Sequence, residues 1–479
     1  MAFPDYAKYD ALGLAELITK KDVTPSELVE EAIARIEKHN GKLNAVVFKT
    51  FDRARSAAKL PPQGSFGGVP FLLKDILGAQ KGVPTRQGSN FIPPAPSPHD
   101  ATLVRRFTSA GLISLGKTNV PEFGLVPTTE STIYGPACNP WSLDHSTGGS
   151  SGGSGAAVAA GIVPLAHAND GGGSIRVPAS ANGLVGLKPT RGRNPLGPDL
   201  GDIMGGLVCE GVVSRSVRDT AAALDATAGN EMGDPYWAPP KPASYLGETQ
   251  TAPGKLKIAF AQKSLFGKMF DPECVAAIQA NAKFLEGLGH HVEEASPPVS
   301  GDAFAAAFMP VWAAGVTMLI DGVAMMTGRV PHESDFQGLT WGFYQLGKQI
   351  SASQYLMCWF QLQMMSRQVA QFHDTYDAWM TTTLGTPTVR NGTLDMHEKD
   401  VAKATEPLFN YLPVTPLQNL TGQPAISLPL ASAANGLPIG IHFAGRFGDE
   451  ATLLRLAGQL EKAKPWTNHH PKIWNREEL

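Results

Sequence analysis

Two glycine- and serine-rich segments that lie close together constrain this chain more than any other feature. Residues 148–154 read Gly-Gly-Ser-Ser-Gly-Gly-Ser, and residues 170–176 read Asp-Gly-Gly-Gly-Ser-Ile-Arg. Glycine allows backbone conformations that other residues avoid, so each segment can hold a serine in a tight turn and direct several N–H groups at one point. A serine hydroxyl and convergent N–H donors serve acyl-transfer enzymes as nucleophile and oxyanion hole. The pair therefore predicts a serine-dependent catalytic site.

A serine hydroxyl also needs a base that takes its proton as it attacks. Lys74 is the strongest candidate, because it follows the apolar run Pro-Phe-Leu-Leu at residues 70–73, which predicts that its side chain is buried. Burial lowers the pKa of a lysine ammonium and leaves a neutral amine that can accept a proton. Taken alone, a lysine in such a segment is more often a surface residue, so a catalytic role for Lys74 depends on the other motifs. In that role it would replace the histidine of the Ser-His-Asp triad.

Three motifs in this order resemble those of the amidase signature family of serine hydrolases. They are P-F-x-x-K-D at residues 70–75, G-G-S-S-G-G-S at 148–154 and D-x-G-G-S-I-R at 170–176. The run Gly-Gln-Pro-Ala-Ile-Ser at 422–427 continues the resemblance, which is weakest between about residues 225 and 380. The resemblance implies the α/β class, with an α/β/α sandwich around a large mixed β-sheet.

The resemblance also implies a role for individual residues. Carried over residue by residue, Lys74 is the base, Ser150 is a bridging serine that follows a cis peptide bond, and Ser174 is the nucleophile. Gly124 lies at a position that is beside the bound substrate in the family. The implied oxyanion hole consists of the N–H groups of Gly171, Gly172, Gly173 and Ser174. This mechanism uses no cofactor and no metal ion.

Two alternative functions also fit parts of the sequence. Residues 148–152 match the G-x-S-x-G elbow of α/β-hydrolases, for which His442 could supply the histidine of a Ser-His-Asp esterase. This pattern is loose, and glycine-rich sequence satisfies it by chance. The amidase signature family also includes the glutaminase subunit of tRNA-dependent amidotransferases, which acts only within a complex. Arg176 is interpreted as an anchor of the loop, in preference to a group that binds a substrate carboxylate.

Residues 301–380 differ in composition from the rest of the chain. They contain 8 of the 13 methionines and 13 of the 38 aromatic residues. Flexible methionines and aromatic rings suit a pocket for bulky apolar groups. The uncharged stretch 303–320 is just long enough to span a membrane, but Pro310 and Gly315 favour a buried helix. We expect one amidase signature domain over residues 1–479, with 301–380 as a variable, helix-rich segment that lines the substrate pocket.

Alternating strands and helices are predicted along much of the chain. Strands are expected at 111–116, 162–166, 255–260, 424–430 and 439–444. Helices are expected from Pro25 after the capping box Thr24–Glu27, at 156–160, at 272–288 and from Asp449.

Composition narrows the partners and the cell compartment. Lys and Arg number 40 against 43 Asp and Glu, a net charge of −3, so we expect neither nucleic acid nor membrane as a partner. The four cysteines are far apart, and residues 1–5 lack the features of a signal peptide, which predicts reduced thiols and a cytoplasmic location. The expected partners are a small-molecule amide or carbamate substrate and, as a candidate, a second copy in a homodimer.

The leading functional hypothesis is an amidohydrolase that cleaves C–N bonds of small, largely apolar amides. The Asn-Pro-Trp segment at residues 139–141 and the glycine- and alanine-rich run at 148–160 resemble the branch of the family that hydrolyses nylon oligomers. Relatives of that branch also accept aryl amides and carbamates. Anilides, carbamates (urethanes) and nylon oligomers are therefore the expected substrate classes.

Overall fold

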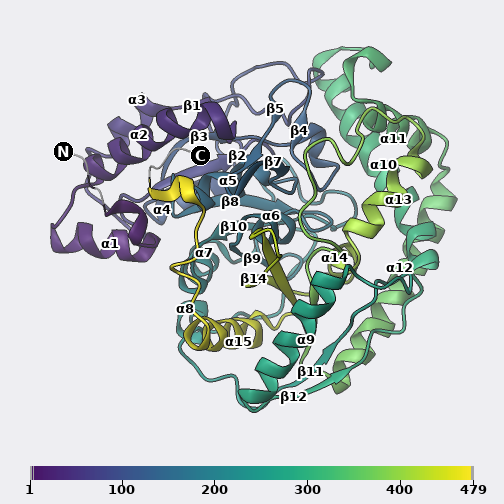
Figure 1. The fold of residues 1–479 in the computed structure, drawn as a ribbon. Coiled ribbons are helices and arrows are strands. Elements are labelled where there is room, and N and C mark those ends of the chain that lie inside the picture. The colour runs from purple at the N-terminus through teal and green to yellow at the C-terminus, as the bar shows by residue number, and fades with distance from the viewer. Residues whose placement is uncertain (1–2, 4, 476–479) are drawn as a thin grey trace.

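A mixed eleven-stranded β-sheet runs through the computed structural model, which describes residue 3 and residues 5–475 (Figure 1). Met1, Ala2 and Pro4, on which the expected lack of a signal peptide partly rests, lie outside the described residues. In spatial order the strands are β1 (Val46–Lys49), β3 (Ile113–Thr118), β2 (Pro70–Lys74), β8 (Leu165–Asp170), β10 (Cys209–Ser214), β9 (Val185–Lys188), β14 (Ala425–Ser432), β15 (Pro438–Gly445), β13 (Ala378–Thr382), β11 (Lys257–Phe260) and β12 (His291–Glu294). Strands β3 and β8 are parallel to β2, β12 and β13 are parallel to β11, and the other neighbours are antiparallel.

Helices surround this sheet and confirm the predicted α/β class. They are α1 (Ala11–Lys20), α2 (Pro25–Leu43), α3 (Phe51–Ala57), α4 (Thr102–Ser109), α5 (Gly152–Ala159), α6 (Arg176–Asn182), α7 (Val217–Thr227), α8 (Tyr245–Glu248), α9 (Pro272–Gly287), α10 (Gly301–Thr327), α11 (Gly338–Lys348), α12 (Ala352–Thr375), α13 (Val401–Tyr411), α14 (Thr415–Thr421) and α15 (Glu450–Ala463). Short 3-10 turns lie at Tyr6–Lys8, Glu122–Gly124, Glu333–Asp335 and Lys472–Asn475, and two small hairpins pair β4 (Glu130–Ser131) with β5 (Gly135–Pro136) and β6 (Cys138–Asn139) with β7 (Ser142–Ser146).

Glycines in the sheet show which helices cover each face. A Cβ at Gly186 of β9 or at Gly440 of β15 would lie 2.6 Å from a side chain of α6, so α6 packs directly on the backbone there. Gly445, five residues further along β15, faces Leu453 of α15 instead. Because alternate residues of a strand face opposite sides, α6 and α15 cover opposite faces. Helix α7 packs beside α15, which completes the sandwich.

The parallel pair β2 and β8 positions the predicted catalytic residues. Leu72 of β2 pairs with Ala166 of β8, and both strands are completely buried. Parallel neighbours end at the same edge of a sheet. Lys74 is the last residue of β2 and Asp170 the last residue of β8, so this edge brings the lysine motif to the second glycine-rich loop.

Helices α10 to α13 gather on one side of the sheet, at the right of Figure 1. Helix α10 is the one helix among the described residues that is long and apolar enough to cross a membrane, by length and composition alone, and half of its most apolar window is buried. Its aromatic side chains Phe304, Phe308 and Trp312 stack on one another at successive turns, with ring centroids 5.0 and 5.6 Å apart. This ladder ends at the second glycine-rich loop, where Trp312 lies near Gly171.

Two predicted strands begin later than expected, for the same reason. The strand expected at 162–166 begins at Leu165, and the strand expected at 111–116 begins at Ile113. In the first case the N–H of Ile162 donates to the carbonyl of Ala157, and Gly161 has φ +69°. The glycine and the apolar residue after it therefore close the preceding helix, as in a Schellman motif, and are not available to the sheet.

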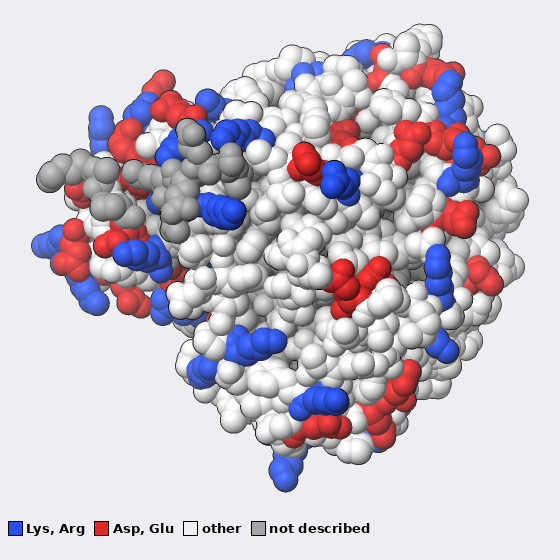
Figure 2. All heavy atoms as spheres, in the orientation of Figure 1, with Lys and Arg blue, Asp and Glu red and all other residues white. Residues whose placement is uncertain are grey.

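Charged side chains are interspersed on the surface. The face in Figure 2 carries basic and acidic residues side by side, separated by broad uncharged areas. This distribution agrees with the near-zero net charge of the chain.

Candidate active site

Lys74 and Ser150 are joined in the buried floor of the site. Lys74 has no exposed surface, and its Nζ lies 2.7 Å from Ser150 Oγ and 2.5 Å from Asn169 Oδ1. Asn169 is itself fixed, since its Nδ2 donates to the carbonyl of Ile76 at 3.1 Å. Asn169 was not predicted from the sequence, although a polar residue near the end of a buried strand was a usable signal.

Burial makes the Lys74 amine a base near neutral pH. Desolvation lowers its pKa to about 7, against a smaller opposing effect of the carboxylates of Glu210 and Asp170. A lysine whose pKa lies near neutrality can carry a neutral amine, which can accept a proton from Ser150. The lysine is therefore poised to act as a general base.

The pH dependence of turnover follows from this pKa. Lys74 is protonated below its pKa and neutral above it, so we expect kcat/KM to rise with pH through about 7 and then to level off. Measuring kcat/KM across about pH 5 to 9 with an uncharged substrate checks this expectation. A rate that is constant or that falls over this range would contradict the role of Lys74 as base.

A buried histidine and a glutamate hold the backbone of Lys74. The Lys74 N–H donates to His167 Nδ1 at 3.2 Å, and His167 Nε2 lies 2.6 Å from Glu210 Oε2. Because Nδ1 accepts a hydrogen bond, the imidazole proton is on Nε2 and is donated to Glu210. His167 therefore orients the strand of Lys74, and its ring nitrogens contact neither Ser150 nor Ser174 in the described structure.

Two glycines lie close to Ser150, at positions where a larger residue would collide with its neighbours. The Gly149–Ser150 peptide bond is cis. A Cβ at Gly149 would lie 2.2 Å from the carbonyl oxygen of Thr128, and a Cβ at Gly124 would lie 3.1 Å from Ser150 Oγ. Gly124, which the resemblance placed beside the substrate, thus leaves space directly next to the bridging serine.

Asp170 shapes the loop that carries Ser174. Its buried carboxylate accepts the N–H groups of Gly173 at 2.7 Å and Ile175 at 3.1 Å, and it pairs with the guanidinium of Arg176. Burial alone would raise the pKa of Asp170, but the combined effect of Arg176, Lys188 and a hydrogen bond from Asn419 outweighs burial and holds this pKa well below its usual range. The Gly173 N–H, which was expected in the oxyanion hole, thus already donates to Asp170 in this structure. The N–H groups of Gly171, Gly172 and Ser174 have no such partner among the described residues.

Arg176 is an anchor, as the sequence reasoning preferred. The side chain is completely buried and donates to Asp170, to Gln418 and to the carbonyl of Thr415. It also contacts His442 Nε2 at 3.1 Å. Arg176 therefore has no free surface with which to bind a substrate carboxylate.

The position of His442 argues against the Ser-His-Asp alternative. Burial, reinforced by Arg176, lowers the pKa of His442 well below its usual value. Its Nε2 faces Arg176, and its buried Nδ1 has no hydrogen-bond partner among the described residues. Ser150, the serine of the elbow pattern, is bonded to Lys74 and not to a histidine.

Ser174 opens into an apolar pocket. The pocket is lined by Ser174 and by four glycines, Gly124, Gly149, Gly172 and Gly173. In the described structure Ser174 Oγ makes no hydrogen bond to Ser150 Oγ. Apolar side chains form much of the wall, among them Phe308, Met309, Trp312, Phe343, Leu408 and Phe409. Among the described residues, no charged side chain lines this pocket.

The wall of the pocket differs in part from the sequence expectation. Helices α10 and α11 contribute, as expected for residues 301–380, but α12, which carries many of the segment's aromatic residues, does not. Helix α13, outside that segment, supplies Thr405, Leu408 and Phe409. Within the part of the chain that is described, no group of His, Cys, Asp and Glu side chains is suited to hold a metal ion.

A mixed sheet with a buried lysine–serine pair beneath an apolar pocket defines a hydrolase of the amidase class. The sequence profile of the Amidase family matches residues 27–454, and the chain belongs to this family of enzymes that hydrolyse amide C–N bonds.

Several named proteins are similar to this chain over almost its whole length. The 6-aminohexanoate-cyclic-dimer hydrolase of Paenarthrobacter ureafaciens is 36% identical over 486 residues, which cover 97% of each protein. The solved structure of 6-aminohexanoate cyclic dimer hydrolase superposes with a TM-score of 0.93 at 35% identity and covers 98% of this chain and 99% of that one. A bacterial aryl acylamidase of the amidase signature family gives a TM-score of 0.89 at 28% identity, with the same coverage.

Proposed function

We propose that this enzyme hydrolyses small, uncharged and largely apolar amides, aryl amides and carbamates through an acyl-enzyme on Ser174. The observation that carries the proposal is the 2.7 Å contact between Lys74 Nζ and Ser150 Oγ, in a site where burial lowers the lysine pKa to about 7. The pocket above this contact contains Ser174 and no charged side chain.

The proposed reaction moves one proton along the serine–lysine relay. As Ser174 Oγ attacks the carbonyl carbon, its proton passes to Ser150 Oγ, and the Ser150 proton passes to Lys74 Nζ. Because the two hydroxyls are not hydrogen-bonded to each other in the described structure, the relay requires Ser174 to turn toward Ser150 when substrate binds. The N–H groups of Gly171, Gly172 and Ser174 stabilise the negative oxygen of the tetrahedral intermediate.

When the C–N bond breaks, the proton moves along the relay in the direction opposite to that of the first step. Collapse of the tetrahedral intermediate breaks the C–N bond, and the proton held by Lys74 returns through Ser150 to the departing amine. A water molecule then attacks the acyl-enzyme with its proton taken by the same relay, which releases the acid and restores the Ser174 hydroxyl. Besides the chain and the substrate, these steps use only water.

The uncharged wall supports a neutral substrate. A substrate with a charged group in this pocket would lose its hydration without gaining a partner of opposite charge. The names of the relatives agree with this requirement, because a cyclic dimer of 6-aminohexanoate has no free amino or carboxyl group and an aryl acylamide is neutral. Free glutamine carries both charges, so the wall disfavours the glutaminase-subunit alternative.

Substrate preference tests the proposal. We expect kcat/KM to rise from acetamide to longer-chain amides, anilides and aryl carbamates, because each methylene buried against the wall contributes up to about 0.8 kcal/mol, or roughly fourfold. Steady-state kinetics over this series measures the trend. Trp312→Ala should reduce the preference, whereas Trp359→Ala on α12, outside the pocket, should leave it unchanged. A preference for acetamide or glutamine would contradict the proposal.

We further propose a cytoplasmic enzyme that forms one catalytic domain over residues 1–479, with residues 301–380 as its variable pocket segment. The four cysteines are free, which agrees with a reducing compartment. The continuous sheet from β1 to β12 supports a single domain.

A further inference from the structure

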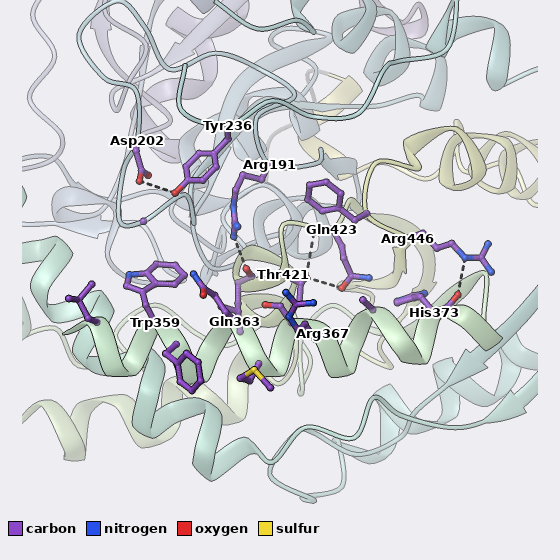
Figure 3. A pocket seen from close by; sticks show the side chains of 18 of the residues that line it. Arg191, Asp202, Tyr236, Trp359, Gln363, Arg367, His373, Thr421, Gln423 and Arg446 are labelled. Atoms are coloured by element: carbon purple, nitrogen blue, oxygen red, sulfur yellow. Dashed lines mark hydrogen bonds between the residues drawn. The ribbon is translucent and has the colours of Figure 1, made fainter. Parts of the chain in front are cut away.

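A second large cavity lies away from the catalytic pocket. This groove has a volume of about 910 Å³, and α12 forms one side of it along the length of the helix (Figure 3). The opposite side comes from the segment around Arg191, from the C-terminal end of α14 with the residues just after it, and from Arg446 after β15. None of its lining residues also lines the pocket that contains Ser174.

Arg191 presents an oriented positive charge to this groove. Its Nε donates to the carbonyl of Gly206 at 2.6 Å, and its Nη2 donates to the carbonyls of Asn419 at 2.8 Å and Leu420 at 2.6 Å. The guanidinium also lies over the ring of Tyr236, 5.6 Å from its centroid. These neutral groups fix the side chain, and no carboxylate pairs with it among the described residues.

Arg367 and Gln363 approach from the opposite wall. Figure 3 shows both side chains projecting from α12 into the groove, toward the wall that holds Arg191 and Thr421. The Arg367 side chain makes no hydrogen bond and no ion pair with another described residue. Two arginines from facing walls are therefore left without an acidic partner.

The acidic side chains in the groove do not neutralise this pair. Asp202 accepts the N–H of Gly206 and, at 3.3 Å, the hydroxyl of Tyr236. Asp374 is two helical turns beyond Arg367, about 10 Å along α12. Arg446, the third arginine of the groove, is paired with Asp377.

A flat apolar surface lies beside the two arginines. Trp359 projects from α12 one turn before Gln363, and its ring packs on the backbone of Gly205, where a Cβ would lie only 2.0 Å from the indole. Gly205 has φ +69°, so both space and backbone conformation favour glycine there. Tyr355 and Phe360 extend the aromatic surface on the same helix.

We propose that this groove binds an organic carboxylate with a flat aromatic body. The carboxylate fits between Arg191 and Arg367. The unoccupied guanidinium of Arg367 can donate paired, charge-assisted hydrogen bonds, and Arg191, whose Nε and Nη2 are held by carbonyls, contributes its charge and its Nη1. The aromatic body rests against Trp359, and the Gln363 amide supplies a further donor. The groove volume is in the range of sites for small organic ligands. This site does not depend on the catalytic role proposed for Ser174.

Calorimetric titration of the whole enzyme with 2-naphthoate tests the proposal. We expect saturable binding that weakens at least about tenfold in Arg367→Gln, because the ligand then loses its charge-assisted hydrogen bonds to that side chain. Arg367 is exposed and unpaired, so the variant should fold normally. Arg390→Gln removes an equally exposed arginine that lies outside both cavities and should bind 2-naphthoate as the wild type does.

Two further ligands separate the charge from the aromatic body. The neutral alcohol 2-naphthalenemethanol and inorganic phosphate should each bind at least about tenfold more weakly than 2-naphthoate. The proposal is overturned if 2-naphthoate does not bind saturably, if Arg367→Gln leaves its affinity unchanged, or if either comparison ligand binds as tightly. Entry of 2-naphthoate into the catalytic pocket alone would show as binding that is insensitive to Arg367→Gln.

Discussion

Turnover by the Ser174→Ala variant is expected to fall by at least about ten-thousand-fold, with little change in stability. The variant removes the hydroxyl that forms the acyl-enzyme, and the other residues that line the pocket offer a single further hydroxyl, that of Thr405. Ser174 Oγ makes no hydrogen bond to another described residue, so its loss should not disturb the loop. Measuring kcat with an anilide substrate, together with thermal unfolding, checks both parts of the expectation.

Thr405→Val is the matched control for this experiment. The Thr405 hydroxyl lines the same pocket, but it donates to the carbonyl of Val401 at 2.7 Å within its own helix and is therefore not a free nucleophile. We expect the valine variant to keep most of the wild-type kcat. Substantial turnover by Ser174→Ala, or complete loss in Thr405→Val, would show that the nucleophile has been assigned to the wrong residue.

Loss of the base is expected to have the second-largest effect. Lys74→Met keeps the length of the side chain but removes the amine that accepts the Ser150 proton, so kcat should fall by at least about a thousandfold. Ser150→Ala interrupts the same relay and should also be severely slowed. Because one proton path runs through both residues, the double variant should be little worse than Lys74→Met. Rates are to be measured at neutral and at alkaline pH.

Lys117 provides the control for Lys74. Lys117 lies on the adjacent strand β3, is also completely buried, and its pKa is lowered by burial to about 8. Its amine donates to the carbonyl of Gly78 and to Thr85, not to a serine of the site. Lys117→Met should lower the Tm while the folded enzyme keeps its kcat. If Lys74→Met and Ser150→Ala retain near wild-type rates at alkaline pH, the relay is wrong.

Much of the fold was predictable because strand ends carry strong local signals. Lys74 and the second glycine-rich loop each come directly after a buried apolar run that forms a strand. Because these two strands are parallel neighbours, Lys74 and the loop lie at the same edge of the sheet. The start of each strand was less predictable. Gly161 and Ile162 look like the beginning of a strand, but their N–H groups close the preceding helix. Apolar composition alone does not separate these two uses.

Some features of the site were also predictable from the sequence, whereas others depend on the tertiary structure. Residue type and motif order predicted the Lys74–Ser150 pair, whereas occupation of the Gly173 N–H depends on how the Asp170 carboxylate folds back onto its own loop. The apolar wall was placed only approximately, since it combines residues of α10 and α13, which are far apart in the sequence. Composition drew attention to the aromatic residues of α12, but these lie in the groove of Arg191 and Arg367.

Covalent labelling of the wild-type enzyme tests the central claim most directly. A serine-reactive fluorophosphonate should add to one residue, because a single hydroxyl is both activated by the relay and open to the pocket. Digestion and mass spectrometry then locate the adduct. We predict one adduct on Ser174, and no adduct in Lys74→Met. Labelling of Ser150 or Ser151, or no labelling of an active enzyme, would contradict the assignment of Ser174 as the nucleophile.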